Sequence, residues 1–215
     1  MQRLIENPPN HTDKMVLSVL IPTTPERVEM FTKLFNEVHK QAEYFRTTHP
    51  SLGKIEILVD SSKRFLDGGL SVGKKRESLV QRATGYYLCF LDSDEEVSPD
   101  YLETILRMCY QDKDICTFKA MAKLHNFWTV VDMRLAYKHN EQVTPDFTVR
   151  RRPWHICAVR SVFAKAFEFS DKNNAEDFEW MDKVLQSCET ETHTDKIIFC
   201  YRHGEHSEVD LIPLP

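Results

Sequence analysis

The chain has 215 residues, of which 41% are hydrophobic and 28% are charged, and its formal net charge is -5. This composition is typical of a globular domain and excludes a disordered chain or a generic polyanion-binding protein. No stretch approaches the ~20 apolar residues that a membrane span needs, and the polar N-terminus lacks the apolar core of a signal peptide. The six cysteines form no C-x-x-C pair and no zinc-type spacing, which favours reduced core thiols in a soluble cytoplasmic protein.

Apolar strands alternate with amphipathic helices in the first half of the chain. Strands are expected over residues 15–21, 54–60, 86–91 and 115–119. Helices are expected after the Thr23-Thr24-Pro25-Glu26 start signal, over residues 74–84 with Gly85 as the C-terminal cap, and after Ser98-Pro99-Asp100. This order predicts a mostly parallel sheet with helices on both sides, in which ligands bind beyond the carboxyl ends of the strands.

The second half of the chain is less regular. Strands are expected over residues 127–133, 147–150 and 196–201, and a helix is expected from residue 174 to about residue 188. We expect a flexible N-terminal segment over residues 1–14 and a single domain over residues 15–215, in which the second half completes the sheet and covers the site.

Two aspartates, Asp92 and Asp94, directly follow the apolar strand that ends at Leu91. Alternate side chains of an extended chain point the same way, so both carboxylates can face one ion. Such hard oxygen ligands suit Mg²⁺ or Mn²⁺, which usually also bind phosphate oxygens. The strands that end at Pro22 and Asp60 should reach the same edge of the sheet.

Five short motifs, in this order, resemble those of the family 2 glycosyltransferases, which have the GT-A fold. The motifs are Ile21-Pro22-Thr23, Ile57-Leu58-Val59-Asp60, Gly73-Lys74-Lys75-Arg76, Ala83-Thr84-Gly85-Tyr86 and Leu91-Asp92-Ser93-Asp94. The resemblance covers roughly residues 15 to 190 and implies a GT-A-type, Rossmann-like α/β domain. The chain departs from the family pattern at Glu77, where the family usually has Asn.

The resemblance implies a nucleotide-sugar donor, with UDP as the expected carrier, and Mn²⁺ or Mg²⁺ as the cofactor. Asp94 would ligate the metal, with Asp92 close to the ribose or the metal and His203 as a further ligand. Asp60 would accept a hydrogen bond from the nucleoside base, and Arg76 would lie near the diphosphate. The donor-binding residues would be Pro22, Thr23, Glu26, Asp60, Gly73, Arg76, Asp92 and Ser93.

The acidic pair Glu176-Asp177 stands at a predicted helix N-terminus and resembles an acidic pair of the same family. In inverting members the Asp of this pair removes the proton from the acceptor hydroxyl, which attacks the anomeric carbon as the nucleoside diphosphate leaves. Asp177 is therefore the expected general base, with Glu176 beside it. The expected acceptor-binding residues are Trp154, His155 and Trp180.

Three functions of other classes stay open. The segment Gly68–Lys75 nearly matches a phosphate-binding P-loop, but Lys75 stands where a hydroxyl residue would hold Mg²⁺. A sugar-phosphate nucleotidyltransferase usually carries glycines after the first strand, where this chain has Pro22-Thr23-Thr24-Pro25. A non-catalytic nucleotide-binding module would keep the fold but would not require both Asp94 and Asp177.

Neither the acceptor nor the oligomeric state can be read from the sequence. One hypothesis is a hydroxylated base in DNA, which is motivated by the basic residues Arg150, Arg151, Arg152, Lys63, Arg64, Lys74 and Lys75. Contacts between such residues and phosphates would make DNA binding fall steeply with salt.

Overall fold

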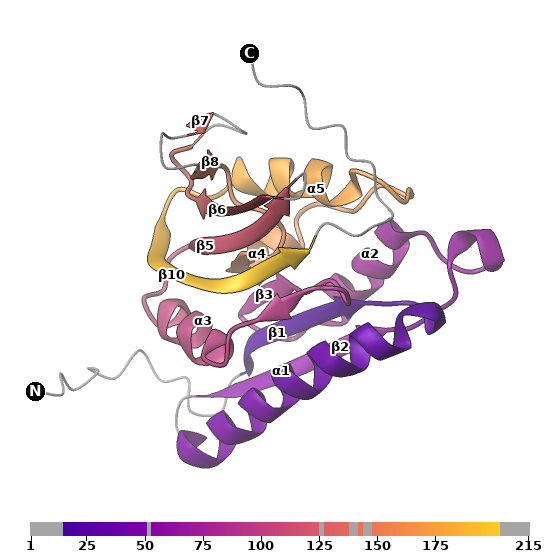
Figure 1. Ribbon diagram of the computed structural model, residues 1–215, viewed down its shortest axis with the longest axis horizontal. Helices are drawn as coiled ribbons and strands as arrows, with labels where there is room; N and C mark the ends of the chain where they lie inside the picture. The colour runs from indigo at the N-terminus through magenta and orange to yellow at the C-terminus, as the bar shows by residue number, and fades with distance from the viewer. Residues whose placement is uncertain (1–14, 51–52, 125–126, 138–141, 144–147, 203–215) are drawn as a thin grey trace, which may run out of the picture.

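A ten-stranded sheet forms the framework of the protein in a computed structural model, which describes residues 15–50, 53–124, 127–137, 142–143 and 148–202 (Figure 1). The strands are β1 (Met15–Pro22), β2 (Lys54–Asp60), β3 (Tyr87–Phe90), β4 (Glu96–Val97), β5 (Ile115–Leu124), β6 (Phe127–Met133), β7 (Gln142–Val143), β8 (Val149–Arg151), β9 (Ala158–Arg160) and β10 (Glu191–Arg202). Their order across the sheet is β2-β1-β3-β9-β5-β6-β8-β7, and β10 pairs with β4 and β5.

Helices cover both faces of this sheet, as predicted (Figure 1). The helices are α1 (Val28–Thr48), α2 (Val72–Arg82), α3 (Tyr101–Cys109), α4 (Ser161–Ala164) and α5 (Glu176–Leu185), with short 3-10 helices η1 (Pro25–Arg27) and η3 (Phe65–Asp67). Helices α1 and α3 contact each other on one face, and α2 contacts α5 on the other. None of the helices in the described ranges combines the length and the apolar character that a membrane crossing requires.

The parallel core of the sheet is formed by β1 between β2 and β3. The apolar, β-branched run of β1 is buried from Val16 to Pro22, and β3 is buried throughout. Strands of this composition are typical of parallel sheets that are covered on both faces. The predicted α/β fold with a mostly parallel central sheet is therefore confirmed.

The strand β9 is a feature that the periodicity of the sequence does not predict. It lies between β3 and β5 and is antiparallel to both, so β5 runs in the same direction as β3 without pairing with it. A strand of three residues is too short to give a recognisable hydrophobic period. The predicted strands at residues 115–119 and 196–201 are parts of the longer β5 and β10, which pair in parallel.

The boundaries of α2 differ from the prediction at both ends. The helix begins at Val72 because the Ser71 hydroxyl accepts a hydrogen bond from the Lys74 N–H at 3.1 Å and so caps it. The role expected for Gly85 as the C-terminal cap is wrong, because the helix ends at Arg82 and Gly85 lies further along the chain. A Cβ atom at Gly85 would collide with the backbone of Ser18, so glycine allows close approach to β1.

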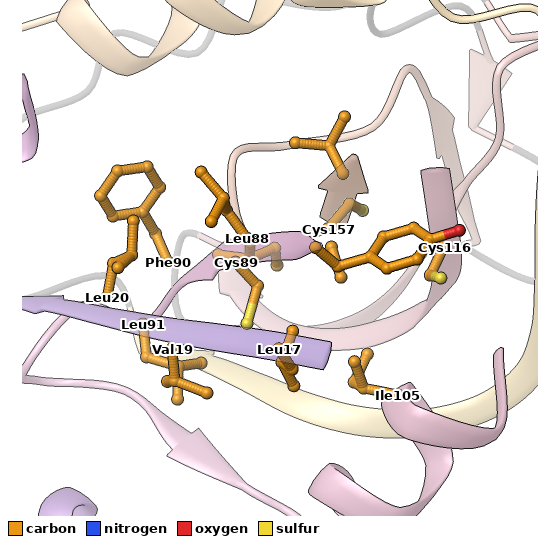
Figure 2. Close-up of a cluster of buried hydrophobic side chains, with 14 of the residues drawn as sticks. Leu17, Val19, Leu20, Leu88, Cys89, Phe90, Leu91, Ile105, Cys116 and Cys157 are labelled. Carbon is orange, nitrogen blue, oxygen red and sulfur yellow. The ribbon is translucent and has the colours of Figure 1, made fainter. Parts of the chain in front are cut away.

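The apolar core is continuous between the sheet and its helices, and Figure 2 shows its central part. The labelled side chains are Leu17, Val19, Leu20, Leu88, Cys89, Phe90, Leu91, Ile105, Cys116 and Cys157. All six cysteines are free in the structure, and four of them are buried.

Candidate functional site

The carboxyl ends of β1, β2 and β3 meet at one edge of the sheet, as the strand order requires. The Thr23 N–H donates to the Asp60 carbonyl at 2.8 Å, and the Leu91 N–H donates to the Leu20 carbonyl at 3.0 Å. The Asp60 carboxylate accepts hydrogen bonds from the Ser62 N–H at 3.0 Å and from the Ser62 hydroxyl at 2.6 Å. Asp60 therefore shapes the turn after β2, at the edge where the sequence predicts a nucleoside pocket.

Lys75 ties the ends of β1 and β2 together. Its ammonium group donates to the carbonyl of Thr23 at 2.7 Å and to the carbonyl of Ser62, and the residue is only 2% exposed. Burial lowers the pKa of Lys75, against the opposing effect of Asp60 and Glu26. A P-loop has at this position a Ser or Thr whose hydroxyl holds Mg²⁺, whereas Lys75 donates to two backbone carbonyls, so the observed geometry does not support the P-loop hypothesis.

Other residues expected to bind the donor have different surroundings. Pro22 is buried at the end of β1, whereas the half-exposed Glu26 carboxylate lies 3.6 Å from Nε of Arg64. Gly73 donates its N–H to the Lys172 carbonyl at 3.0 Å, and a Cβ atom there would collide with the backbone of Ser170. Gly73 therefore allows the 170–172 segment to approach α2.

Arg76 is a buried cation shared by two carboxylates. Its side chain is 4% exposed, and Nη2 donates to the two carboxylate oxygens of Asp92 at 2.8 and 3.1 Å. Nε donates to the carboxylate of Glu176 at 3.2 Å, and the guanidinium lies over the ring of Phe90. Burial opposes its charge, but Asp92, Asp177 and Glu176 outweigh burial and raise the pKa of Arg76.

His155 connects Asp92 to Asp177. Its Nδ1 lies 2.9 Å from the Asp177 carboxylate, and its Nε2 lies 3.3 Å from the Asp92 carboxylate. Burial and Arg76 would lower the pKa of His155, but the two carboxylates outweigh them and raise it. Burial would raise the pKa of Asp177, but His155 and then Arg76 outweigh burial and lower it. We call Glu176, Arg76, Asp92, His155 and Asp177 the active-site network.

Asp94 lies outside this network. Its carboxylate is 3.3 Å from Nη1 of Arg27. Burial raises the pKa of Asp94, Arg27 lowers it, and repulsion from Asp92 raises it further, with a net rise. Burial and then Asp92 also raise the pKa of Glu95, whose carboxylate accepts from the Asp92 N–H at 2.8 Å. Ser93 is fully buried, and its hydroxyl has no hydrogen-bond partner among the described residues.

The fit of a divalent cation rests on Asp94. A cation there would relieve the repulsion and the burial that oppose its ionisation, and would compete with the half-exposed Arg27, 3.3 Å away. Asp92, in contrast, would have to leave Arg76 and His155 in order to bind a metal. No three His, Cys, Asp or Glu side chains form a metal site within the described part of the chain, and His203 and His206 lie outside it. The residues therefore fit an ion held by Asp94 together with oxygens of the donor.

The aromatic residues expected to bind the acceptor differ in their accessibility. Trp180 is 1% exposed, stacks on Phe169, and donates its indole N–H to the carbonyls of Ala164 and Phe167. Contrary to the expectation, its indole is therefore part of the core and is not available to an acceptor. Trp154 is half-buried and lies under the guanidinium of Arg151, whose Cζ is 4.0 Å from the centroid of the Trp154 ring.

The three consecutive arginines do not form a single basic patch. Arg150 is exposed and lies over the ring of Tyr137, whereas Arg152 pairs with Asp182 at 2.6 Å. Burial lowers the pKa of Arg151, which faces Trp154, to about 9. This arrangement follows from β8, where neighbouring side chains point to opposite faces of the sheet.

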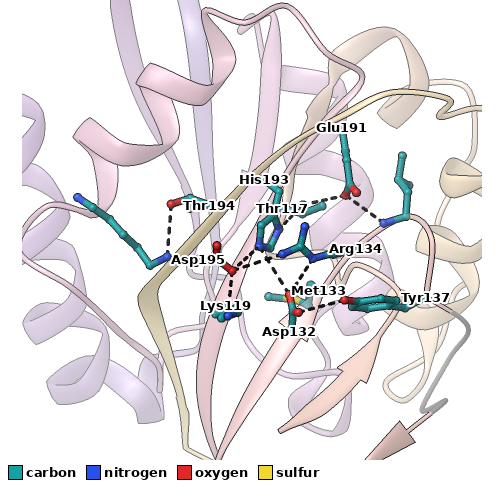
Figure 3. Close-up of polar contacts among 12 residues, drawn as sticks. Thr117, Lys119, Asp132, Met133, Arg134, Tyr137, Glu191, His193, Thr194 and Asp195 are labelled. Atoms are coloured by element: carbon teal, nitrogen blue, oxygen red, sulfur yellow. Dashed lines mark hydrogen bonds and ion pairs between the residues drawn. The ribbon is translucent and has the colours of Figure 1, made fainter. Parts of the chain in front are cut away.

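A second, partly buried polar cluster lies at the amino-terminal ends of β5 and β10 (Figure 3). His193 lies 3.0 Å from the Thr117 hydroxyl through Nδ1, and its Nε2 is 3.6 Å from Asp132 and 3.5 Å from Asp195. We call Thr117, Lys119, Asp132, Arg134, Glu191, His193 and Asp195 the β5–β10 cluster. This cluster was not predicted, because Glu191–Asp195 is polar at every position and does not show the alternation of a strand with one polar face.

Three further residues of the site were not predicted to belong to it: Lys75, Arg27 and Glu95. Lys75 stands within a recognised motif and Glu95 directly follows another, so their positions pointed to the site. Their buried contacts depend on the folded chain and could not be predicted. Arg27 belongs to the η1 turn, and its pairing with Asp94 joins segments that are far apart in the sequence.

Comparisons with known proteins agree with this architecture. Residues 65–171 match the family described as Glycosyl transferase family 2, and no curated protein matches the sequence. The crystal structure of Staphylococcus aureus TarS 1–349 is 16% identical at a TM-score of 0.60, with 87% of this chain and 60% of that chain covered. The same TarS fragment in complex with UDP-GlcNAc is 16% identical at a TM-score of 0.58, with coverages of 90% and 60%.

A crystal structure of S. aureus TarS is 15% identical at a TM-score of 0.56, and the match covers 87% of this chain and 37% of that one. The chain thus spans about 60% of the length of the TarS fragment and a smaller part of the longer TarS structure. At these identities the likeness is one of fold. Together, these comparisons show a match to glycosyl transferase family 2 over residues 65–171, within a chain that has a GT-A-type α/β fold.

Proposed function

We propose that this protein transfers a sugar from a UDP-linked donor to an acceptor hydroxyl, with inversion at the anomeric carbon. The observation that carries this proposal is the position of the Asp177 carboxylate at the start of α5, 2.9 Å from Nδ1 of His155. His155 lowers the pKa of this carboxylate and so favours its ionised form. The family match supports sugar transfer, and the TarS structures in complex with UDP and with UDP-GlcNAc motivate UDP as the carrier.

Asp177 is the proposed general base. It accepts the proton of the acceptor hydroxyl as the oxygen attacks the anomeric carbon, and the nucleoside diphosphate leaves on the opposite face. His155 fixes the orientation of the Asp177 carboxylate through Nδ1, so we assign it a positioning role in place of direct contact with the acceptor. Glu176 pairs with Arg76 and is only 4% exposed, which supports a role in holding α5 against α2.

The donor is proposed to bind where β1 and β2 end, between the turns at Thr23 and Asp60. Thr23 has a buried hydroxyl without a hydrogen-bond partner among the described residues, which a donor group or a water would satisfy. Asp94 is the residue proposed to hold Mn²⁺ or Mg²⁺, which when bound neutralises charge on the leaving diphosphate. Asp92 and Arg76 are assigned to the active-site network, since both oxygens of Asp92 already face Arg76.

Calorimetric titration of UDP, with and without Mn²⁺, tests the donor site without knowledge of the acceptor. We expect UDP to bind in a metal-dependent manner and the affinity to fall by about tenfold or more in Asp94→Ala, because a carboxylate ligand is lost. Asp195→Ala is the matched control, since Asp195 is an exposed aspartate of the β5–β10 cluster. Preference for ATP over UDP, or equal affinity in both variants, would contradict the donor assignment.

A further inference from the structure

Strand β2 forms the outer edge of the sheet (Figure 1). It pairs in parallel with β1 along its whole length, and among the strands that the structure describes it has no second neighbour. An edge strand presents backbone N–H and C=O groups that can pair with another strand.

The side chains of β2, like its backbone, are only partly covered by the rest of the protein. Every residue of β2 keeps part of its surface accessible, in contrast to β1, which is buried from Val16 to Pro22. Ile55, Ile57, Leu58 and Val59 are all half-buried, although they pack against the core. The edge is therefore apolar as well as unpaired on one side.

Apart from the charges at its two ends, β2 lacks the usual features that protect an edge strand. It contains no proline, and its register with β1 is regular from Leu17 onward. Its one charge away from the ends is Glu56, whose carboxylate accepts from the hydroxyl of Ser18 at 2.5 Å and from the Thr84 N–H at 2.5 Å. Because Glu56 turns toward β1 and the end of α2, it does not guard the edge.

We propose that two copies of this chain associate by antiparallel pairing of β2 with β2 of the second copy, centred on Ile57. This is the register that pairs all seven residues of the strand. It brings Lys54 of each copy opposite Asp60 of the other, and Ile55 opposite Val59. The pairing joins opposite charges at both ends of the ladder and apolar side chains at Ile57 and in the two Ile55–Val59 pairs. Glu56 lies opposite Leu58, with its carboxylate held by Ser18 and Thr84.

The charge pattern of β2 favours a second copy over an unrelated strand. Lys54 and Asp60 are equally distant from Ile57, so a two-fold axis through Ile57 matches each with its opposite. The carboxyl ends of the β1–β3 strands in the two copies then point in opposite directions, so each copy keeps its own candidate site. The inference does not depend on the proposed function.

Oxidative cross-linking of cysteine variants of the full-length protein tests the register. In Ile57→Cys the two introduced thiols lie opposite each other at the two-fold axis, so mild copper–phenanthroline oxidation is expected to give a covalent dimer. In the matched control Ile55→Cys each new thiol faces Val59 of the second copy, and we expect little more dimer than in wild type, which has six cysteines of its own. Equal cross-linking of both variants, or none in Ile57→Cys, would overturn the proposal.

Sedimentation equilibrium provides a second measurement that needs no change in the apolar strand. Wild type is expected to approach twice its 25.2 kDa mass as its concentration rises. Lys54→Asp places like charges at both ends of the ladder and should raise the dimer Kd by about two- to thirtyfold. Lys183→Asp, an exposed site on α5, should leave it unchanged. A monomer mass at all concentrations, or a dimer Kd that Lys54→Asp does not change, would also overturn the proposal.

Discussion

The active-site network and the β5–β10 cluster both place a largely covered histidine among carboxylates, yet the two histidines have opposite electrostatic settings. The ring of His155 has carboxylates on both nitrogens, at 2.9 and 3.3 Å, and its pKa is raised. The ring of His193 has Asp132 and Asp195 at 3.6 and 3.5 Å, and burial and then Arg134 lower its pKa.

The difference shows that carboxylates near a buried histidine do not by themselves fix its charge. In the active-site network the cation Arg76 is matched by Asp92 and Glu176, so the carboxylates beside His155 still raise its pKa. In the β5–β10 cluster Asp195 also lies near Lys119 and Arg134, at 2.9 and 3.3 Å, so its negative charge is shared. The distance of each carboxylate and the cations that compete for it decide whether burial prevails.

The largest expected effect concerns the proposed general base. Asp177→Asn should lower the rate of UDP release from UDP-GlcNAc by about 10²–10⁴-fold, because the amide cannot accept a proton, whereas UDP binding should be retained. Asp182→Asn is the matched control on the same helix, since Asp182 pairs with Arg152 at the surface. A turnover near that of wild type in Asp177→Asn would show that the ionised carboxylate is not the base.

The next largest effect concerns the stability of the active-site network. Arg76→Leu leaves Asp92 and Glu176 without their cation, and removal of one partner from a buried pair costs about 3–5 kcal/mol. Urea unfolding followed by circular dichroism measures this loss. The control is Arg107→Leu, which breaks an exposed pair with Glu103 and should cost less than about 1 kcal/mol. Equal losses in the two variants would mean that the network adds nothing beyond a surface ion pair.

The smallest effect is a pH dependence from the β5–β10 cluster. Because the folded-state pKa of His193 is lowered from its ordinary value of 6.5, the unfolded chain binds the proton more readily. Wild type should therefore lose stability as the pH falls below about 6.5, and the loss should level off below the folded-state pKa. The groups facing the ring are Thr117, Asp132, Asp195, Arg134 and Glu191.

In His193→Gln this part of the acid destabilisation should disappear, and in His39→Gln, a change at an exposed position on α1, it should remain. Urea unfolding at about pH 7.5 and about pH 5.5 compares the two variants. The same acid sensitivity in wild type and His193→Gln would remove the contrast between the two histidines.

Local signals in the sequence were sufficient for the elements that carry the fold. The apolar runs of β1, β2 and β3 and the start signals of α1 and α3 are local patterns, and the observed elements agree with them to within a few residues. Their alternation determined that the strand ends at Thr23, Asp60 and Asp92 share one edge, because consecutive parallel strands must expose the same ends together.

Contacts between distant segments depend on how the chain folds back on itself. The pairing of Arg76 with Glu176 joins residues that are 100 positions apart, and the link from His155 to Asp92 spans 63 positions. No local period encodes such contacts, and none could indicate that Trp180 faces the core while Trp154 stays half-buried. Local patterns specify which residues stand at the strand ends. The packing of α2 and α5 against the sheet selects which of them neutralise one another, because burial makes every unpaired charge costly.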